Sequence, residues 1–301
     1  MLVKRIDIHC HTISEPDLCR DDGQTFMTPQ ELFKVYDAIG VERSVLLPVV
    51  TPDGSYDGNT NREIQALVRQ YPDRFSWFCN VDPRHGKNSP DTDFDRIVRH
   101  YKDRGAAGVG EIVANMPFDE PRVEALFAAC QRLNMPILFH MGDFCNDYGL
   151  ADRLGLPLLE NALRKFPKLI FIGHSQKFWA EISGDLTEEL RGKYPKGPVV
   201  PGGRLVELME RYPNLYADLS AGSGYNAVTR DLQFGCTFLE RFQDRIFYGI
   251  DMSAPSDANR KMIGLGTLLD QWVTEGKLSQ LAYEKVCRGN ALRLLKGELV
   301  L

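Results

Sequence analysis

Eight short apolar runs, rich in β-branched residues, recur along this chain with amphipathic helical patterns between them. Most of the runs begin about thirty residues apart, the length of one strand, one helix and their two loops. Eight such units predict an α/β protein whose parallel strands close into a (β/α)8 TIM barrel, with an open doubly wound sheet as the alternative. The predicted strands begin near Val3, Arg43, Phe75, Ala106, Pro136, Lys168, Asn214 and Arg245.

Proline and glycine mark the ends of several predicted helices. Thr28-Pro29 opens a helix that closes at Gly40, and Asp119-Glu120-Pro121 opens another that runs to Asn134. Since proline disfavours a helical residue before it, an aromatic-proline pair is a good helix end. Three such pairs stand just before predicted strands, at Pro72, Pro167 and Pro213.

Two segments depart from this repeat. Residues 175–203 form an insertion after the sixth strand that is rich in Gly, Pro, Lys and Glu, and it is either a lid or rim over one barrel mouth or a loop without function. Residues 257–298 hold two helical stretches, one more than a barrel requires, and we expect the extra helix to cover the outside. The whole chain, 1–301, is predicted to be a single domain.

Composition excludes several classes of protein. The 301 residues are 43% hydrophobic, and the net charge of −5 is spread along the chain, which gives no footprint for nucleic acid or a membrane. Charged residues interrupt the first apolar run, so no signal peptide is expected, and seven cysteines without a CxxC pair argue against a disulfide framework. We expect a cytoplasmic protein that acts on a small molecule, either alone or as a homo-oligomer such as a dimer.

Six residues with metal-binding side chains fall at the carboxyl ends of predicted strands. Enzymes built on this barrel place their active sites at that end. The six are His9 and His11 in IDIHCHTI, Glu111 in GVGEIV, His140 in PILFHMGD, His174 in LIFIGHS and Asp251 in IFYGIDMS.

Strand periodicity places these side chains on one face. Because side chains two apart in a strand share a face, His9 and His11 should project together while Cys10 turns toward the helices. By the same rule Asp7 shares their face and is either a hydrogen-bond partner of a ligand imidazole or an ordinary buried polar residue. All six residues could then converge on the barrel axis.

Imidazole and carboxylate ligands suit a divalent transition metal, with Zn²⁺ first and Mn²⁺, Fe²⁺ or Co²⁺ as alternatives. Such a metal lowers the pKa of a water in its open position from about 15.7 toward about 7. Asp251 would accept the proton of that water and pass it to the leaving group.

The ordered set, H-x-H after strand one, His after strands five and six, and Asp after strand eight, resembles the amidohydrolase superfamily. Within it the chain looks most similar to the branch of aminocarboxymuconate semialdehyde decarboxylase, which the VDPR run at 81–84 also fits. The resemblance implies that His9, His11, His140 and Asp251 bind the principal metal, and that His174 binds a second metal or orients substrate. Glu111 stands where many members have a carbamylated lysine and resembles the bridging Glu of TatD-type hydrolases, so one or two metals per chain are expected.

Other residues near these motifs are weaker candidates. Arg20, Arg84 and Lys177 are the basic residues nearest the ligand motifs, and we carry Arg84 and Lys177 as candidates to clamp a substrate carboxylate, or else as partners of surface carboxylates. His85 and His100 are interpreted as surface residues. Cys19 and Cys145 follow strands one and five but are interpreted as small fillers rather than ligands.

The sequence therefore predicts a metal-dependent hydrolase that cleaves a C–O or C–N bond of a small, carboxylated or cyclic metabolite with metal-activated water. The alternative is a non-oxidative decarboxylase or hydratase with one metal, in which His174 handles protons. A third hypothesis is a barrel that keeps the metal for stability or ligand binding, without turnover.

Overall fold

The computed structural model describes residues 2–20, 23–53, 58–144 and 147–299. Its eight main strands follow the predicted order. No strand begins more than three residues from its predicted start. The strands are β1 (Arg5–Cys10), β2 (Val41–Leu46), β3 (Phe75–Trp77), β4 (Val109–Ile112), β5 (Ile137–Gly142), β7 (Phe171–His174), β8 (Leu215–Asp218) and β9 (Ile246–Phe247).

All neighbouring strands run parallel, in two sheets of order β1-β2-β3 and β4-β5-β7-β8-β9. Parallel bridges join the sheets at both edges, Cys79 with Val109 and Cys10 with Met252. These bridges complete a ring of eight strands, and the predicted TIM barrel is confirmed. A short extra strand, β6 (Leu150–Ala151), pairs in parallel with the last two residues of β5.

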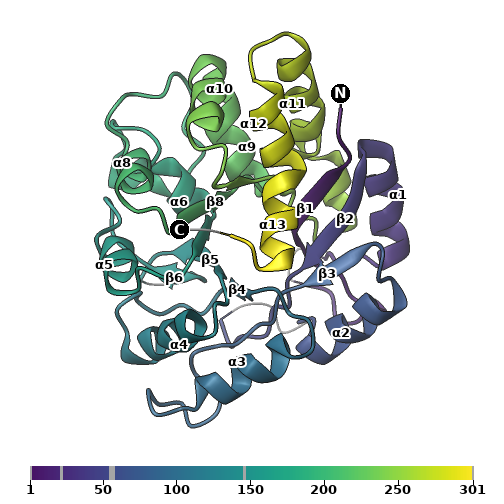
Figure 1. Ribbon diagram of the computed structural model, residues 1–301, viewed down its shortest axis with the longest axis vertical. Coiled ribbons are helices and arrows are strands. Elements are labelled where there is room, and N and C mark those ends of the chain that lie inside the picture. Colours follow the sequence, from purple (N-terminus) through teal and green to yellow (C-terminus); the bar gives the residue numbers. More distant parts are fainter. Residues whose placement is uncertain (1, 21–22, 54–57, 145–146, 300–301) are drawn as a thin grey trace.

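Helices surround the ring, one or more after each strand (Figure 1). The helices that lead back to the next strand are α1 (Pro29–Ile39), α2 (Asn61–Gln70), α3 (Phe94–Lys102), α4 (Pro121–Arg132), α5 (Pro157–Lys165), α8 (Arg204–Arg211) and α10 (Leu232–Arg241). Further helices in the connections are α6 (Gln176–Ala180), α7 (Glu188–Arg191) and α9 (Ala221–Thr229). After β9 come η1 (Pro255–Asn259), η2 (Lys261–Gly264), α11 (Leu265–Thr274), α12 (Gln280–Glu284), η3 (Lys285–Gly289) and α13 (Asn290–Lys296).

The boundary of α1 illustrates why the sequence signals work. The Thr28 hydroxyl accepts from the amide of Glu31, whose carboxylate accepts from the amide of Thr28, so two amides of the first turn are satisfied. Gly40 ends the helix with φ of 73°, which only glycine adopts without strain. The helix at Pro121 ends at Arg132, two residues before its predicted end at Asn134.

Two hydrophobic clusters divide the core between the barrel interior and the helix layer. The interior cluster takes side chains from most strands, and it also includes Ala291 and Leu294 of α13. The C-terminal helix therefore packs against the interior at the amino ends of the strands, instead of covering the outside as expected. Interior strand positions are Ile6, Ile8, Val45, Leu138, Ile172, Tyr216 and Phe247.

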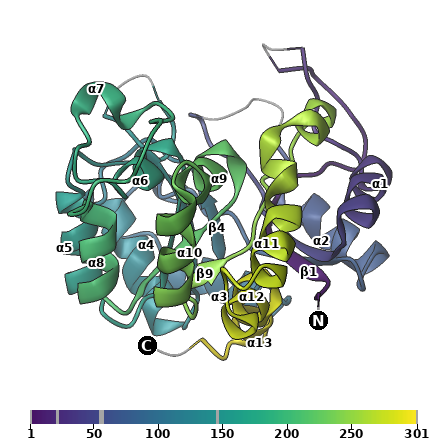
Figure 2. The same cartoon turned by 90° about the horizontal axis from the view of Figure 1, so that it is seen from above.

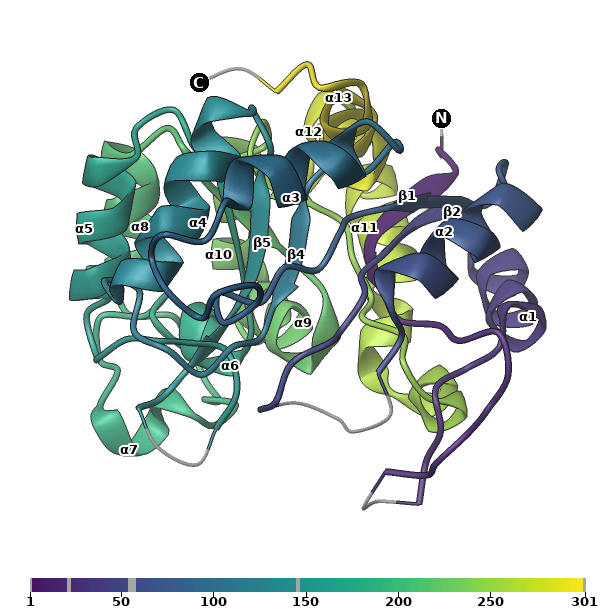
Figure 3. The same ribbon diagram turned by 90° about the horizontal axis from the view of Figure 1, so that it is seen from below.

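The insertion at 175–203 lies at the opposite end of the barrel from α13 (Figure 2). The same division, with α7 at one end and α12 and α13 at the other, is visible in the view from below (Figure 3). Arg191 of α7 is buried and ties the insertion to the loop after β5, donating to Asp143 Oδ1 at 2.7 Å and to the Asp152 carbonyl at 2.9 Å. No helix within the described ranges has the length and apolar character that spanning a bilayer requires.

Candidate metal centre

The six predicted metal-binding residues meet at the carboxyl ends of the strands, as predicted from the strand pattern. Four of them belong to strands, His9 to β1, Glu111 to β4, His140 to β5 and His174 to β7. His11 directly follows β1, and Asp251 lies in the segment after β9. Asp251 has φ of 63°, and its amide donates to the His9 carbonyl at 2.9 Å, which fixes its carboxylate beside β1.

Three donor atoms form a compact group, from His9, His11 and Asp251. His9 Nε2 and His11 Nε2 lie 3.1 Å apart, and Asp251 Oδ1 lies 3.5 Å from His9 Nε2 and 3.4 Å from His11 Nε2. Ligands at Zn–N and Zn–O distances in a tetrahedral site are separated by about 3.4 Å, so the spacing of these three atoms fits one divalent cation. Glu111 Oε2 lies 3.4 Å from each of the two imidazole nitrogens but is not grouped with Asp251.

The hydrogen bonds behind the two imidazoles agree with metal ligation. His11 Nδ1 lies 2.8 Å from the Leu47 carbonyl, which can only accept, and His9 Nδ1 lies 2.6 Å from Asp218 Oδ2. Both Nδ1 atoms are therefore the protonated ones in the neutral rings, and both Nε2 atoms present lone pairs to each other. Two lone pairs at this distance repel unless a cation lies between them.

The charges of the cluster also favour a cation. Burial lowers the pKa of His9 and His11, but the carboxylates of Asp251 and Glu111 outweigh it, raising that of His9 well above its usual range and that of His11 to about 9. Burial would raise the pKa of Glu111 and Asp251, yet the imidazoles hold both below their ordinary values. Burial and the nearby His9 lower the pKa of His174 to about 4, so its ring is neutral.

Glu111 stands between two groups of imidazoles. Its Oε2 faces His9 and His11, while its Oε1 lies 3.0 Å from His140 Nδ1 and 3.9 Å from His174 Nε2. Donor atoms of His9, Glu111 and His174 form a second potential metal group, whereas His140 belongs to neither group found among the described residues. This is the arrangement of a carboxylate that could bridge two ions.

Two residues behind the cluster were missed by the sequence reasoning. Asp218 at the end of β8 accepts from His9 Nδ1, and the Ser220 hydroxyl donates to Asp218 Oδ2 at 2.7 Å. Asp218 ends the seventh predicted strand just as the predicted ligands end theirs, so its position was a usable signal. Ser220 carried none.

Asp7 does not share the face of His9 and His11, so that inference from periodicity was wrong. Its carboxylate accepts from the amides of His9 and Ile250 and from the Tyr36 hydroxyl on α1. The pairing of β1 is irregular between Asp7 and Cys10, which shifts the alternation of side chains. Asp7 therefore fixes backbone, and Asp218 is the partner of the His9 imidazole.

A pocket of about 660 Å³ opens onto the cluster, a size suited to a small molecule. Its wall combines aromatic rings, Phe26, Tyr148 and Tyr194, with two basic side chains, Arg20 and Arg260. Five of the six predicted site residues line it, and His9 lies behind them. The insertion contributes Gln176 and Tyr194, so it forms part of the pocket rim.

The three basic candidates take different positions. Arg20 lines the pocket, where its guanidinium lies over the Phe26 ring. Arg84 pairs with Asp82 and Asp53, and Lys177 pairs with Asp147 and Asp143; neither is among the pocket-lining residues. Contact of Arg84 or Lys177 with substrate stays a prediction.

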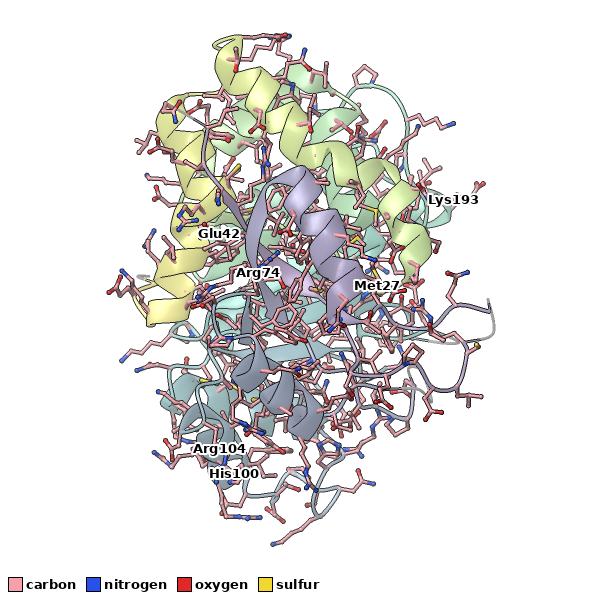
Figure 4. All side chains as sticks on the ribbon, turned by 90° about the vertical axis from the view of Figure 1, so that its right-hand side faces the viewer. Met27, Glu42, Arg74, His100, Arg104 and Lys193 are labelled. Carbon is pink, nitrogen blue, oxygen red and sulfur yellow. The ribbon has the colours of Figure 1, made fainter. Side chains whose placement is uncertain are left out.

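The remaining candidates lie away from the donor groups. His85 accepts from the Asp82 amide, and His100 lies beside Arg104 at the edge of the molecule (Figure 4). Cys19 is exposed and belongs to no donor group among the described residues. Cys145 falls outside the residues that the structure describes.

Comparison with known proteins identifies the family. A model of the amidohydrolase family matches residues 6–297, so the chain belongs to this enzyme family, and the predicted superfamily resemblance is confirmed. No curated protein matches the chain in sequence.

Solved structures of similar fold share little sequence with it. An uncharacterised TIM-barrel protein from Bordetella bronchiseptica has a TM-score of 0.65 and 15% identity, over 98% of this chain and 99% of that one. A 2,6-dihydroxybenzoate decarboxylase from Rhizobium has a TM-score of 0.55 at 15% identity, over 98% and 99%. A probable 2-pyrone-4,6-dicarboxylic acid hydrolase from Acinetobacter baumannii, with citric acid bound, has a TM-score of 0.56 at 15% identity, over 98% and 100%.

Proposed function

We propose that this protein is a metal-dependent hydrolase of a small, carboxylated or cyclic metabolite, with Zn²⁺ as its metal and Mn²⁺ or Fe²⁺ as alternatives. The observation that carries the proposal is the group of three donor atoms, from His9, His11 and Asp251, spaced 3.1 to 3.5 Å apart beside a pocket for a small molecule. These three residues would hold the principal ion, whereas His140, which the family resemblance also assigns to it, belongs to neither donor group among the described residues.

When bound, the metal would supply Lewis acidity, lowering the pKa of water and polarising the bond to be broken. Asp251 borders both the donor set and the pocket, so it is placed to accept the proton of an attacking water and deliver it to the leaving atom. Arg20 and Arg260 offer positive charge on the pocket wall for a substrate carboxylate.

Glu111 favours hydrolysis over the alternative. Each of its oxygens faces a different group of imidazoles, which suits a bridge between two ions. The second potential metal group consists of His9, Glu111 and His174, and an ion there would make His174 a ligand rather than a proton carrier. One of the structural relatives described above is, by its name, a probable dicarboxylic acid hydrolase.

A metal-dependent decarboxylase or hydratase on the same scaffold is the second candidate. His174 favours it, because its Nε2 lies 3.7 Å from Asp251 Oδ2 and its ring lines the pocket, where Nε2 could take up a proton and pass it to the carbon that loses CO2. One of the structural relatives is a decarboxylase of an aromatic acid.

Metal stoichiometry is the first test. Elemental analysis of wild-type protein and Glu111→Ala, each loaded with Zn²⁺ and desalted, should give about two ions per chain falling to about one. One ion in both proteins would instead support the decarboxylase. Absence of tightly bound metal from the wild type would overturn both.

A substrate screen then separates the reactions. A panel of small lactones, cyclic amides and aromatic carboxylic acids should give ring-opened acids without CO2 if the enzyme is a hydrolase. CO2 release that depends on His174 and persists in Glu111→Ala would establish the decarboxylase. Turnover in neither assay, with metal bound, would leave the metal a structural or binding role.

A further inference from the structure

Ser220 lies at the centre of the hydrogen bonds behind the cluster, although it neither lines the pocket nor belongs to a donor group. It is fully buried, and its hydroxyl oxygen lies 2.7 Å from Asp218 Oδ2, 2.9 Å from His174 Nδ1 and 3.2 Å from His9 Nδ1. It follows β8, while the two imidazoles come from β7 and β1. One hydroxyl therefore joins three strands.

The protons of this group can be assigned by counting donors and acceptors. A carboxylate only accepts, so Asp218 Oδ2 takes hydrogen bonds from the Ser220 hydroxyl and from His9 Nδ1. The single proton of the hydroxyl is then used, and its oxygen can only accept from His174 Nδ1. His174 must carry its proton on Nδ1 and present a bare Nε2 to the cluster.

Further contacts hold the serine in this role. Its own amide donates to Asp218 Oδ1 at 2.9 Å, which fixes the carboxylate relative to the hydroxyl. Gly249 makes room for the pair, because a Cβ there would lie 2.3 Å from Asp218 Oδ1 and 2.8 Å from the Ser220 Cβ. The opposite assignment, with the hydroxyl donating to His174, would leave the buried Asp218 oxygen with one donor fewer, which is costly.

We propose that Ser220 is a positioning residue that sets the tautomer of His174 and, through Asp218, couples the orientation of His174 to that of His9. With its proton on Nδ1, His174 offers a lone pair that can bind a metal or accept a proton. Its part in metal binding rests on the proposed function, but the tautomer does not.

The test is the tautomer itself, read by long-range ¹H–¹⁵N spectra of protein labelled with ¹⁵N-histidine. The signal of His174 is identified as the one lost in His174→Gln. Wild-type protein, both metal-free and Zn²⁺-loaded, should show the proton on Nδ1. Ser220→Ala should shift His174 toward the Nε2-protonated form in the metal-free protein, and Ser220→Thr, which keeps the hydroxyl, should restore the wild-type signal.

Metal affinity gives a second readout. Competition for Zn²⁺ with a chromophoric chelator should show affinity reduced by about tenfold to a hundredfold in Ser220→Ala, as is usual for residues behind ligands. Asp218→Asn should have the larger effect because it releases His9 as well. Ser44→Ala is the control. It also removes a fully buried hydroxyl, but this hydroxyl has no hydrogen bond to any described residue of the site, so the Zn²⁺ affinity of the variant should match that of the wild type.

A His174 signal unchanged in Ser220→Ala, or a wild-type His174 protonated on Nε2, would overturn the proposal. Ser220→Cys, which keeps most of the volume with a weak acceptor, gives the same test if the alanine variant does not fold. If the wild type binds no Zn²⁺, the proposed function fails while the metal-free tautomer still decides the role of Ser220.

Discussion

At the scale of single residues, the site separates groups that face the pocket from groups that hold them. His11, Glu111, His140, His174 and Asp251 face the pocket. Asp218, Ser220 and the Leu47 carbonyl fix which imidazole nitrogen carries a proton. Sequence patterns find the pocket-facing residues because several histidines and acidic residues at the ends of successive strands form a recognisable set. Ser220, two residues past the end of β8, has no feature in the sequence that distinguishes it from other serines.

Glu181, at the end of α6, gives a prediction about pH. Burial, partly offset by the Gly155 amide and Arg191, raises its pKa to about 7. The folded protein therefore keeps a proton that the unfolded chain releases at a pKa of about 4.3, so stability should fall as pH rises from about 4.5 to 7. Glu181→Gln should remove this fall, worth on the order of 3 kcal/mol.

Urea unfolding at pH 5 and pH 8 measures this effect. The wild type should lose more free energy of unfolding between the two values than the variant does. Equal losses in both proteins would mean that Glu181 is ionised at no cost beside Arg191.

At the scale of elements, the loops after β2, β3 and β4 are linked through Arg84. Its Nη2 donates to Asp53 and Asp82, both at 2.6 Å, and Asp53 Oδ2 also accepts from the Asn115 amide at 2.8 Å. Asp53 lines the main pocket, whereas Arg84 lines a smaller neighbouring one. Arg84 thus positions Asp53 in the wall of the main pocket without lining that pocket itself.

Arg84→Ala should raise KM for the substrate by about tenfold through loss of this wall, with metal content unchanged. Asp53→Asn should reproduce the effect. Arg74→Ala is the matched control, since Arg74 also pairs with a carboxylate at similar exposure (27% against 23% for Arg84) but stands before β3, at the other end of the barrel. An effect of Arg84→Ala that Asp53→Asn lacks would mean that Arg84 binds substrate directly.

Most elements could be predicted from the sequence because their signals are local. Thr28, Glu31 and Gly40 define α1 by contacts within a few residues. What the sequence did not show is non-local. The irregular pairing of β1 turned Asp7 away from the site, and the ion pairs that Arg84 and Lys177 make with particular carboxylates are contacts that sequence spacing does not reveal. The position of α13 depends on which part of the molecule its apolar face packs against, and hydrophobic periodicity in the sequence does not show this partner.

At the scale of the whole molecule, the barrel is closed at one end by α13 and open to a pocket at the other. Leu294 is buried in the interior cluster, so Leu294→Ala should lower the free energy of unfolding by about 2 to 4 kcal/mol. Leu281→Ala on the exposed face of α12 is the control and should cost little. Chemical denaturation measures both, and equal small losses would show that α13 contributes little to the core.

Both ends of the described chain lie on the side of the barrel away from the insertion (Figure 2). The insertion forms part of the pocket rim through Gln176 and Tyr194, so the chain ends are far from that rim. A solid support, a fluorescent protein or a second enzyme attached at either end would therefore leave the entrance free. The protein could be immobilised in a flow reactor by its N-terminus or its C-terminus with the same access for small solutes. Attachment through Cys19, near the pocket-lining Arg20, would place the support beside the entrance instead.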